Sequence, residues 1–374
     1  MQDNDLSYHD VLDDPRKNLT NIFVTSLDDS DNEEENTPEN TIQPSPYLTE
    51  SDFLDYLDNK GVNDRSHLKL INFNIANILS KLHDLNIFIQ NITNRSNRPN
   101  LIFINETHLH EQQNHGYSKE DIKNLLPGYT FHHRDRTTVR GGGVGVFIDD
   151  RISSVTSVET SDFIDEVFES ITIKIPSVSN VDPNRPNKNL VIISIYRQPG
   201  GENFDRFMNA LRKWLRKWDK PSNEIVIAGD TNFDLLKLQS HLPTQNYTDL
   251  LVSHRLLPRI TLPTRIKHQS ATIIDHLFTC AHIDTGIFTT ELSGSYGFTD
   301  HYPIFGVIPT KPIIKQRQIC VTKRYFTQEG HENRKEGLRN ENWGAFFAEG
   351  DPTILYNTLL KKYSFHYEQN KMES

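Results

Sequence analysis

The 374-residue sequence contains only two cysteines, Cys280 and Cys320, and it has no apolar run long enough to cross a membrane. Two cysteines cannot form the disulfide framework of a small secreted domain, and they fit a reducing compartment. A membrane-spanning helix needs about 20 mainly apolar residues, so no membrane contact is predicted. The N-terminal stretch MQDNDLSYHDVLDD is acidic and polar, unlike a secretory signal. We therefore expect a nuclear or cytoplasmic protein that is not secreted.

Basic residues are scarce at the start of the chain. Residues 1–66 contain 17 acidic and 4 basic residues, a net charge of −13, whereas the whole chain carries −10. The difference leaves residues 67–374 with a charge of +3. The stretch DDSDNEEENTPENTIQPSP has too few apolar side chains to offset the entropy lost on ordering. We predict that residues 1–66 form an acidic disordered tail, in which TESDFLDYLDNKG is a candidate amphipathic helix.

From Leu68 onward, apolar runs of strand length alternate with segments of helical periodicity. Nearly continuous apolar runs such as LIFINET, LVIISIY and EIVIAGD are typical of strands covered on both faces. The segment NFDRFMNALRKWLRKW instead places Phe204, Phe207, Leu211 and Leu215 on one face of a helix, with a basic solvated face opposite. This order predicts an α/β domain over residues 67–309, with two sheets packed together and helices outside.

Many of the predicted strands end in, or begin with, a chemically active side chain. In α/β folds, the loops beyond the strand ends carry function because the scaffold there is rigid. Each residue alone is weak support, since a buried aspartate, histidine or tyrosine is more often structural. The set in its order along the chain is much more informative: Asn74, Glu106, Tyr196, Asp230, Asn232, Asp275, Asp300 and His301.

The residue types of this set suit the hydrolysis of a phosphodiester. Glu106 is a natural anchor for a hard cation such as Mg²⁺, which takes few carboxylates and keeps several waters. A histidine held by a buried carboxylate has a fixed ring and a stabilised charged form, and Asp275 is the candidate partner of His301. Asp230 could orient or deprotonate a water. Hydrogen bonds to the phosphate could come from Tyr196 and Asn232.

Six separated blocks, NFN, NET, IYRQP, GDTN, IDHLF and TDH, together resemble the endonuclease/exonuclease/phosphatase superfamily. The resemblance covers about residues 68–309. It implies a DNase I-like four-layer sandwich, in which two packed mixed β-sheets are flanked by helices, and cleavage of phosphate esters with Mg²⁺ or Mn²⁺. The blocks PTRIKHQSATIIDHLFT, GFTDHYPIFGVI and RGGGVGVFI are most similar to the apurinic-like endonuclease domain of non-LTR (LINE-type) retrotransposons. That branch implies nicking of one DNA strand to leave a 3′-hydroxyl.

The resemblance also implies a role for each matching residue. The catalytic positions are His301, Asp230, Asn232, Tyr196 and Asp275. The positions that support the metal are Glu106, Asn74 and Asp300. The expected substrate contacts are Arg140, Thr264, Arg265 and Thr299, the last in place of a serine. One departure is Ala76, because repair enzymes of the superfamily carry an aspartate two residues after the first asparagine, which puts a second metal position in doubt.

Two segments have competing interpretations. In RGGGVGVF, a strand-like run follows the glycines, whereas a P-loop needs Lys-Ser/Thr and a dinucleotide site needs a helix, so a tight turn close to DNA is predicted. Residues 310–374 are basic and extended and then helical, and they resemble the connector that precedes a reverse transcriptase. We therefore expect a fragment, or a truncated or domesticated product, with RNA or the reverse transcriptase of a parent element as partners. A plain helical appendage is the alternative.

Two other functions remain open at the level of sequence. One is a different phosphoesterase of the same superfamily that acts on a lipid, an inositol phosphate or RNA. The basic loops and the connector favour DNA over these substrates. The other is a catalytically silent remnant that binds nucleic acid. The complete set of catalytic side chains argues against it.

Overall fold

The computed structural model describes residues 19, 44–94, 97–109, 119–135, 141–159, 163–164, 166–179, 188–267, 270–281, 283–289, 299–311, 324–325, 328–348, 351–369 and 372–373. Contacts divide the chain into two units, Met1–Lys315 and Gln316–Ser374. The second unit contains helices α8 (Gln328–Arg339), α9 (Gly344–Phe347) and α10 (Pro352–Gln369), and β17 (Arg324–Tyr325) pairs with β18 (Met372–Glu373). Within the described parts of the chain, no helix combines the length and hydropathy that a bilayer-spanning segment requires.

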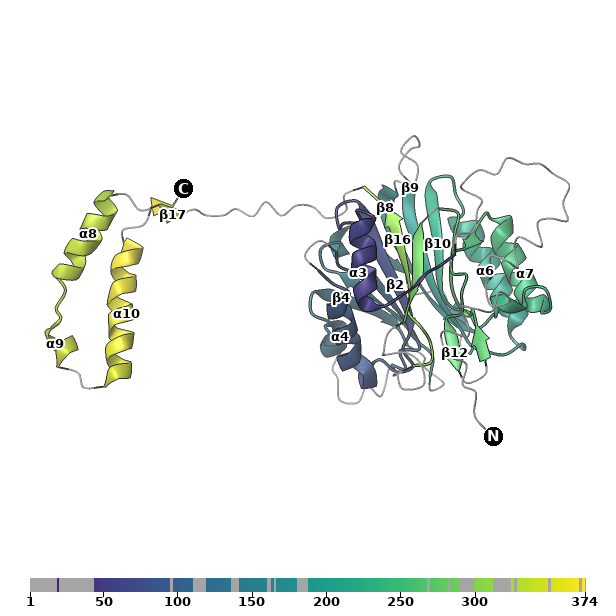
Figure 1. Ribbon diagram of the computed structural model, residues 1–374, viewed down its shortest axis with the longest axis horizontal. Coiled ribbons are helices and arrows are strands. Elements are labelled where there is room, and N and C mark those ends of the chain that lie inside the picture. Colours follow the sequence, from purple (N-terminus) through teal and green to yellow (C-terminus); the bar gives the residue numbers. More distant parts are fainter. Residues whose placement is uncertain are drawn as a thin grey trace. The chain divides into compact units, whose positions relative to one another are not determined.

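The first unit is built on two mixed sheets of seven strands each (Figure 1). The strand order of the first sheet is β1 (Tyr47–Leu48), β15 (Asp284–Phe288), β16 (Ile304–Pro309), β2 (His67–Asn74), β3 (Leu101–Asn105), β5 (Val144–Asp149) and β4 (Tyr129–Arg134). The order of the second is β11 (Leu257–Pro258), β14 (Asp275–Thr279), β10 (Asn223–Asp230), β9 (Lys188–Arg197), β8 (Phe168–Ser179) and β6 (Ser157–Glu159), with β7 (Phe163–Ile164) also paired to β8. A separate hairpin joins β12 (Arg265–Lys267) to β13 (Ser270–Thr272).

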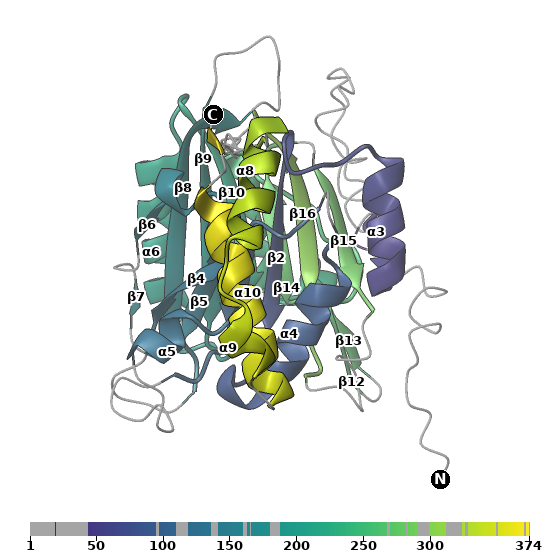
Figure 2. The ribbon, with the colours of Figure 1, turned by 90° about the vertical axis from the view of Figure 1, so that its left-hand side faces the viewer.

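Helices cover the outer face of each sheet (Figures 1 and 2). The first sheet packs against α3 (Glu50–Asn59) and α4 (Leu82–Asn91), and the second against α6 (Phe204–Trp218) and α7 (Leu242–Ser253). Shorter helices are α5 (Lys119–Lys123), η3 (Leu79–Lys81), η4 (Ser153–Val155) and η5 (Leu235–Lys237). The four-layer sandwich predicted from the sequence is therefore confirmed.

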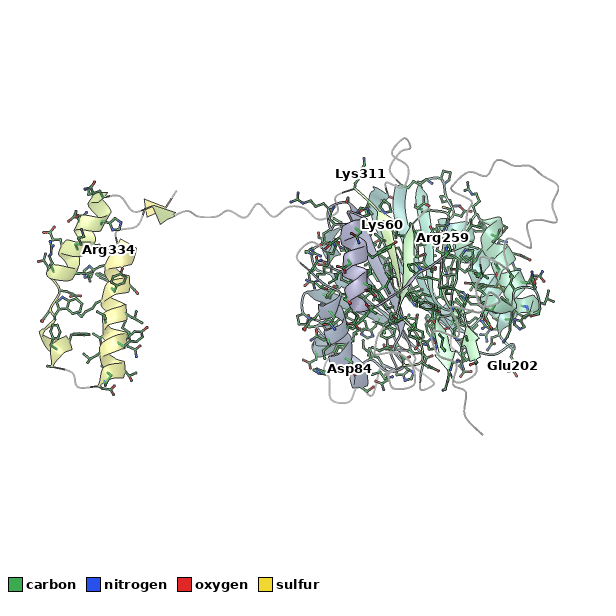
Figure 3. All side chains as sticks on the ribbon, viewed as in Figure 1. Lys60, Asp84, Glu202, Arg259, Lys311 and Arg334 are labelled. Atoms are coloured by element: carbon green, nitrogen blue, oxygen red, sulfur yellow. The ribbon has the colours of Figure 1, made fainter. Side chains whose placement is uncertain are left out.

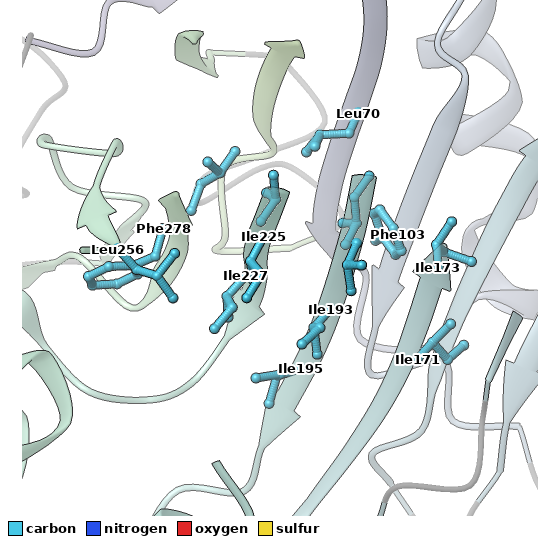
Figure 4. Close-up of a cluster of buried hydrophobic side chains, with 14 of the residues drawn as sticks. Leu70, Phe103, Ile171, Ile173, Ile193, Ile195, Ile225, Ile227, Leu256 and Phe278 are labelled. Carbon is cyan, nitrogen blue, oxygen red and sulfur yellow. The ribbon is translucent and has the colours of Figure 1, made fainter. Parts of the chain in front are cut away.

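The apolar runs supply two cores because neighbouring residues of a strand point to opposite faces. In β3, Leu101 and Phe103 belong to the core between the sheets, whereas Ile102 and Ile104 belong to the core beneath α3 and α4. Figure 4 shows Phe103 beside side chains of the second sheet, among them Ile193. Strands with both faces covered need apolar residues at every position, which explains why these runs are nearly continuous.

Helix α6 confirms the predicted one-sided pattern. Phe207, Leu211 and Leu215 are fully buried, and Trp214 and Trp218 pack with them at 4% and 6% exposure. The arginines and lysines of the RKWLRKW stretch are exposed. This face of α6 is the solvated surface expected of an amphipathic helix.

The folded unit begins earlier than the predicted boundary at residue 66. Thr49 and Asp52 form a capping box that starts α3. Phe53 and Leu57, four residues apart, are buried beneath the helix, and Lys60 (labelled in Figure 3) forms an ion pair with β15. Residues 44–66 are therefore not part of a disordered tail, because this segment carries its own cap and apolar face. Of residues 1–43, only Leu19 lies within the described part of the chain, and it is buried.

Candidate active site

The candidate residues meet where strands of both sheets end. In the second sheet, the register places Tyr196 at the end of β9 beside Asp230 at the end of β10, and Asp230 beside Asp275 at the start of β14. In the first sheet, Asn74 at the end of β2 lies beside Asn105 at the end of β3. Nδ2 of Asn74 lies 2.8 Å from Oδ2 of Asp230. The two sheets therefore present their polar strand ends to each other.

Asn74 holds two carboxylates together. Its Nδ2 donates to Oε1 of Glu106 at 2.9 Å and to Asp230, while its Oδ1 accepts the backbone N–H of Ala76 at 3.2 Å. The side-chain oxygen therefore faces the backbone and the nitrogen faces the carboxylates. In this orientation Asn74 positions the carboxylates of Glu106 and Asp230. That it supports a bound metal ion stays a prediction.

Asp230, Asp275 and His301 form one side of the site, which we call the buried wall. Their side chains are 1%, 2% and 9% exposed. Nδ1 of His301 lies 2.9 Å from Oδ2 of Asp275 and 4.0 Å from Oδ2 of Asp230. The hydroxyl of Thr264 donates to the same oxygen of Asp275 at 2.8 Å. The structure thus brings together the predicted histidine–aspartate pair and fixes the ring.

The buried wall shifts two pKa values in ways that suit proton transfer. Burial opposes the charged form of His301, but the Asp275 carboxylate outweighs it and raises the pKa of His301 to about 9. Burial and the nearby Asp275 carboxylate raise the pKa of Asp230 to about 7. At neutral pH the wall therefore offers an imidazolium and a carboxylate poised to take a proton, which is the pairing that acid–base catalysis requires.

The facing side is partly exposed, and we call it the open wall: Glu106, His108, Arg265 and Asp300. Nε2 of His108 lies 3.1 Å from Oε2 of Glu106. Burial alone would raise the pKa of Glu106, but hydrogen bonds from His108 and Asn74 lower it to about 2. A hydrogen bond from Tyr196 acts in the same direction. Glu106 is therefore a carboxylate at any physiological pH.

Arg265 and Asp300, predicted to contact substrate and metal respectively, bind each other. Nε and Nη2 of Arg265 donate to Oδ2 of Asp300 at 2.9 and 2.7 Å. The other oxygen of Asp300, Oδ1, lies 3.9 Å from Nε2 of His301. A backbone bridge between Arg265 and His301 fixes the β12–β13 hairpin at the edge of the site. The open wall is thus joined to the buried wall through the loop that carries Asp300 and His301.

Two predicted substrate contacts have a different place. Thr264 is fully buried and also accepts the N–H of Asp275 at 3.1 Å. Thr299 is 6% exposed, donates to the carbonyl of Asn74 at 3.1 Å and accepts the N–H of His301 at 3.2 Å. Their short side chains are used by nearby backbone and carboxylate groups. Both threonines therefore position the walls, and substrate contact by either one stays a prediction.

Asn232 and Arg140 complete the predicted set. The N–H of Asn232 donates to Oδ1 of Asp230 at 3.1 Å, and its side-chain Nδ2 donates to the carbonyl of Arg197 at 2.7 Å. Asn232 therefore braces the loop after β10 against the end of β9. Arg140 lies outside the described residues.

The loops of the site hold the backbone in an unfavourable conformation. Among the described residues, seven non-glycine residues have a positive φ, and five of these belong to three loops at the site. They are Ala76, Asn77, Glu106, His108 and Asn232, with φ of 48°, 104°, 54°, 52° and 53°. Each such conformation costs of order 1–3 kcal/mol and persists only where the surroundings enforce it. Clustering of such residues is typical of functional sites.

Glycine is required at two positions beside the site. Gly229 precedes the Asp230 strand end with a φ of 133°, and a Cβ there would overlap the carbonyl of Ile195. Gly143, in the RGGG run, has a φ of 83°, and a Cβ there would overlap the hydroxyl of Thr107. The N–H of Thr107 donates to the carbonyl of Gly143 at 3.2 Å. The turn predicted for the glycine run therefore supports the Glu106 loop.

Sequence reasoning missed two residues that serve the site. Asn105 is fully buried behind Asp230, whose N–H donates to its Oδ1 at 3.2 Å, and its Nδ2 donates to the carbonyl of Ile195 at 3.3 Å. It joins the two sheets just below the site. The signal in the sequence is an asparagine that ends the apolar run LIFIN, directly before Glu106. His108 was missed as well, although it follows Glu106 by only two residues in NETHL.

The residues present fit a divalent cation on the open wall. Among the described residues, Asp230, Asp275 and His301 offer ligand atoms within 4.8 Å of one another. That group is buried, however, and two of its members already bind each other. Glu106 and Asp300 are partly exposed, and hydrogen bonds lower the pKa of each despite burial. Anionic oxygen donors open to water are what Mg²⁺ or Mn²⁺ requires.

Residues 71–301 match the sequence profile of the endonuclease/exonuclease/phosphatase family, and the matched range contains every residue of both walls. The chain belongs to this family. Its members are hydrolases that act on phosphodiesters or phosphate monoesters, generally with a divalent metal ion. No curated protein shows a significant match to the sequence.

Solved structures with a similar fold are distant in sequence. A 3′–5′ exonuclease from Neisseria meningitidis shares 13% identity with a TM-score of 0.47, covering 65% of this chain and 100% of that chain. The endonuclease domain of TRAS1, a telomere-specific non-LTR retrotransposon, shares 11% identity with a TM-score of 0.43, covering 65% and 98%. A mannosyl-6-phosphatase from Bacteroides thetaiotaomicron shares 13% with a TM-score of 0.43, covering 64% and 99%. At these identities the likeness concerns the fold alone.

Proposed function

We propose that this family member is a divalent-metal-dependent DNA endonuclease that nicks one strand and leaves a 3′-hydroxyl, like the endonuclease domains of LINE-type retrotransposons. The observation that carries the proposal is the meeting of two unlike walls at one strand edge. One is the buried group of Asp230, Asp275 and His301, and the other is the open wall with Glu106. Together they supply a base, a charged donor and a metal anchor, the parts that phosphodiester hydrolysis needs.

The buried wall handles the protons. Asp230, with its pKa raised to about 7, accepts the proton of the water that attacks phosphorus. His301 is charged at neutral pH. Its Nε2–H donates a hydrogen bond to a phosphate oxygen, while its Nδ1–H stays hydrogen-bonded to Asp275. The bond between phosphorus and O3′ then breaks, and O3′ takes a proton from solvent, which gives a 3′-hydroxyl and a 5′-phosphate. Removing Asp275 would free the ring and lower its pKa.

The open wall handles the charge of the phosphate. Glu106 and Asp300 would hold Mg²⁺ or Mn²⁺, which supplies Lewis-acid stabilisation of the negative charge that develops on the phosphate. Asn74 and Tyr196 keep the Glu106 carboxylate in place and anionic through their hydrogen bonds. The wall is open because an ion that keeps several waters must remain in contact with solvent.

DNA is the proposed substrate because basic side chains lie next to the two walls. The β12–β13 hairpin places Arg265 and Lys267 beside Asp300 and next to His301. A polyanionic backbone that runs past the site would meet these charges. Arg265 and Lys267 lie in the block PTRIKHQSATIIDHLFT, and Asp300 and His301 lie in GFTDHYPIFGVI. Both blocks are among those most similar to the retrotransposon branch. We also propose that residues 310–374 connect the nuclease to the reverse transcriptase of a parent element.

The test is relaxation of supercoiled plasmid by the full chain in Mg²⁺, beside Asp230→Asn and His301→Gln. We expect open circles with the wild type alone, and nicks that a DNA polymerase extends without prior treatment. A folded wild type that leaves the plasmid intact in Mg²⁺ and Mn²⁺ but cleaves bis-p-nitrophenyl phosphate would indicate another phosphoester substrate. Inactivity on both substrates would indicate a silent nucleic-acid-binding remnant.

A further inference from the structure

A lysine in η3 binds the turn that follows β2. Nζ of Lys81 donates to the carbonyl of Ile75 at 2.9 Å and to that of Ala76 at 3.2 Å. Lys81 is half-buried, and it ends the short helix η3. Two hydrogen bonds to backbone carbonyls hold its ammonium group in one place, unlike that of an ordinary surface lysine.

The backbone that Lys81 holds is joined to the open wall. The N–H of Asn77 donates to the carbonyl of Glu106 at 2.9 Å, and the side chain of Asn74 binds the Glu106 carboxylate. Burial lowers the pKa of Lys81, and the carboxylates of Glu106 and Asp300 act against it. The ammonium group is therefore within electrostatic range of both carboxylates that would hold the ion.

The same turn lacks a carboxylate. Residues 75–81 contain no aspartate or glutamate, and the carbonyl oxygen of Ala76 is bound by Lys81. Two divalent ions held side by side repel each other and need several carboxylates to offset that repulsion. This turn carries no carboxylate at Ala76 and adds a positive charge at Lys81. Its charge therefore disfavours a second ion.

We propose that Lys81 takes the place of a second metal ion: its ammonium group restricts the open wall to one divalent ion and binds an oxygen of the substrate phosphate. The claim that Lys81 binds the phosphate, the phosphate half, rests on the proposed function. The claim that it limits the site to one ion, the metal half, does not. A fixed positive charge has opposite effects on the two ligands. It weakens the binding of a cation and strengthens that of a phosphodiester. A lysine that only shapes the turn would support both.

The test is to measure both ligands separately on the full chain with Lys81→Gln, whose amide can still donate to the two carbonyls but has no charge. Mn²⁺ is titrated by calorimetry without DNA, and a DNA duplex is titrated by fluorescence anisotropy in EDTA at several salt concentrations. Lys81→Arg retains the charge. Lys60→Gln serves as the matched control, because Lys60 pairs with Asp284 outside both walls.

We expect one Mn²⁺ per wild-type chain, and binding by Lys81→Gln that is tighter by about tenfold. We expect its DNA affinity to fall, and the slope of log K against log salt to lose about one unit. Lys81→Arg and Lys60→Gln should match the wild type in both titrations. Thermal unfolding of each variant verifies that it is folded.

Three results would overturn the proposal. They are two ions per wild-type chain, Mn²⁺ affinity that is unchanged in Lys81→Gln, or weaker binding of both Mn²⁺ and DNA, which would show that the lysine only shapes the turn. Failure of the wild type to bind DNA at any salt concentration would reject the proposed substrate and the phosphate half with it. The metal half would still be decided by the Mn²⁺ titration.

Discussion

The buried wall and the open wall each contain a histidine bound to a carboxylate, yet the two pairs are held differently. The side chains of His301 and Asp275 are 9% and 2% exposed, whereas those of His108 and Glu106 are 30% and 24% exposed. The same Asp275 oxygen also accepts a hydrogen bond from the hydroxyl of Thr264, so two side chains fix the position of the carboxylate. In the buried pair, the carboxylate fixes the orientation and the protonation of the histidine. In the solvent-exposed pair, the carboxylate remains accessible to a metal ion. The two pairs contain the same types of residue, so their different exposure gives them different roles.

The largest effect is expected at the sealed pair. His301→Gln removes the imidazolium but not the bulk, and we expect kcat to fall by about 10³-fold or more at saturating metal, because a charged donor in a buried site is lost. Raising the Mg²⁺ concentration should not restore the rate. The measurement is the initial rate of plasmid nicking against Mg²⁺ concentration.

The matched control is another histidine–aspartate pair that lies outside both walls. Nδ1 of His254 lies 2.6 Å from Oδ2 of Asp219 between the ends of α7 and α6. His254→Gln should nick DNA at the wild-type rate. If His301→Gln retained more than about a tenth of that rate, the proton chemistry assigned to the buried wall would be wrong.

The open pair should respond to metal concentration. His108→Gln weakens the support of Glu106, and the loss of such a supporting group typically costs 10–100-fold in metal affinity. We expect the Mg²⁺ concentration that gives half-maximal nicking to rise by about that factor, with little change in the maximal rate. A fall in the maximal rate that excess Mg²⁺ does not restore would remove the distinction between the walls.

The sequence predicted the strand-end residues because each stands at the end of an apolar run, where local pattern and chemistry coincide. It could not predict the partners of the side chains. Arg265 and Asp300 are 35 residues apart and meet only because the β12–β13 hairpin bridges to His301. Nor does the sequence show that the hydroxyls of Thr264 and Thr299 bind Asp275 and the carbonyl of Asn74, because those contacts depend on how the two sheets pack.

The boundary of the tail was wrong for a different reason. Net charge placed the predicted boundary at residue 66, whereas the candidate amphipathic helix in TESDFLDYLDNKG is confirmed: α3 has a capping box and two buried apolar residues one helical turn apart. Net charge indicates how well a whole segment is solvated, but it does not show whether a short helix within that segment packs against the domain. Two buried side chains, Phe53 and Leu57, are enough to dock a ten-residue helix. A capping box and correctly spaced apolar residues therefore indicate an ordered helix even within a strongly acidic segment.

A second buried histidine behaves in the opposite way to His301. Nδ1 of His276 lies 2.9 Å from the hydroxyl of Thr231, its Nε2 lies 3.1 Å from the carbonyl of Ile273, and burial lowers its pKa to about 4. The unfolded chain protonates at about pH 6.5, so stability falls as the pH drops below that value towards 4. His301, with its pKa raised to about 9, contributes stability that is complete below about pH 6.5 and is lost as the pH rises towards 9.

Urea unfolding at pH 5, 7 and 9 separates the two histidines. Because of His276, we expect the free energy of unfolding to be about 2 kcal/mol lower at pH 5 than at pH 7. His276→Gln should remove this decrease. His301→Gln should flatten the alkaline side instead. Equal pH dependence in the two variants would mean that burial alone, and not the Asp275 carboxylate, decides the state of both rings.

The smallest effect is expected from two adjacent residues that serve different walls. Thr264→Val leaves the buried Asp275 carboxylate with one hydrogen bond fewer, and we expect a loss of about 1–3 kcal/mol in the free energy of unfolding. Arg265→Gln breaks an ion pair whose side chains are 36% and 28% exposed, and such pairs contribute about 1 kcal/mol or less.

Urea unfolding at low and high salt measures the free energy lost in each variant, and salt should reduce only the Arg265 effect. If Arg265→Gln cost as much as Thr264→Val, exposure would not be what separates the two walls, and the open wall would be a rigid part of the fold.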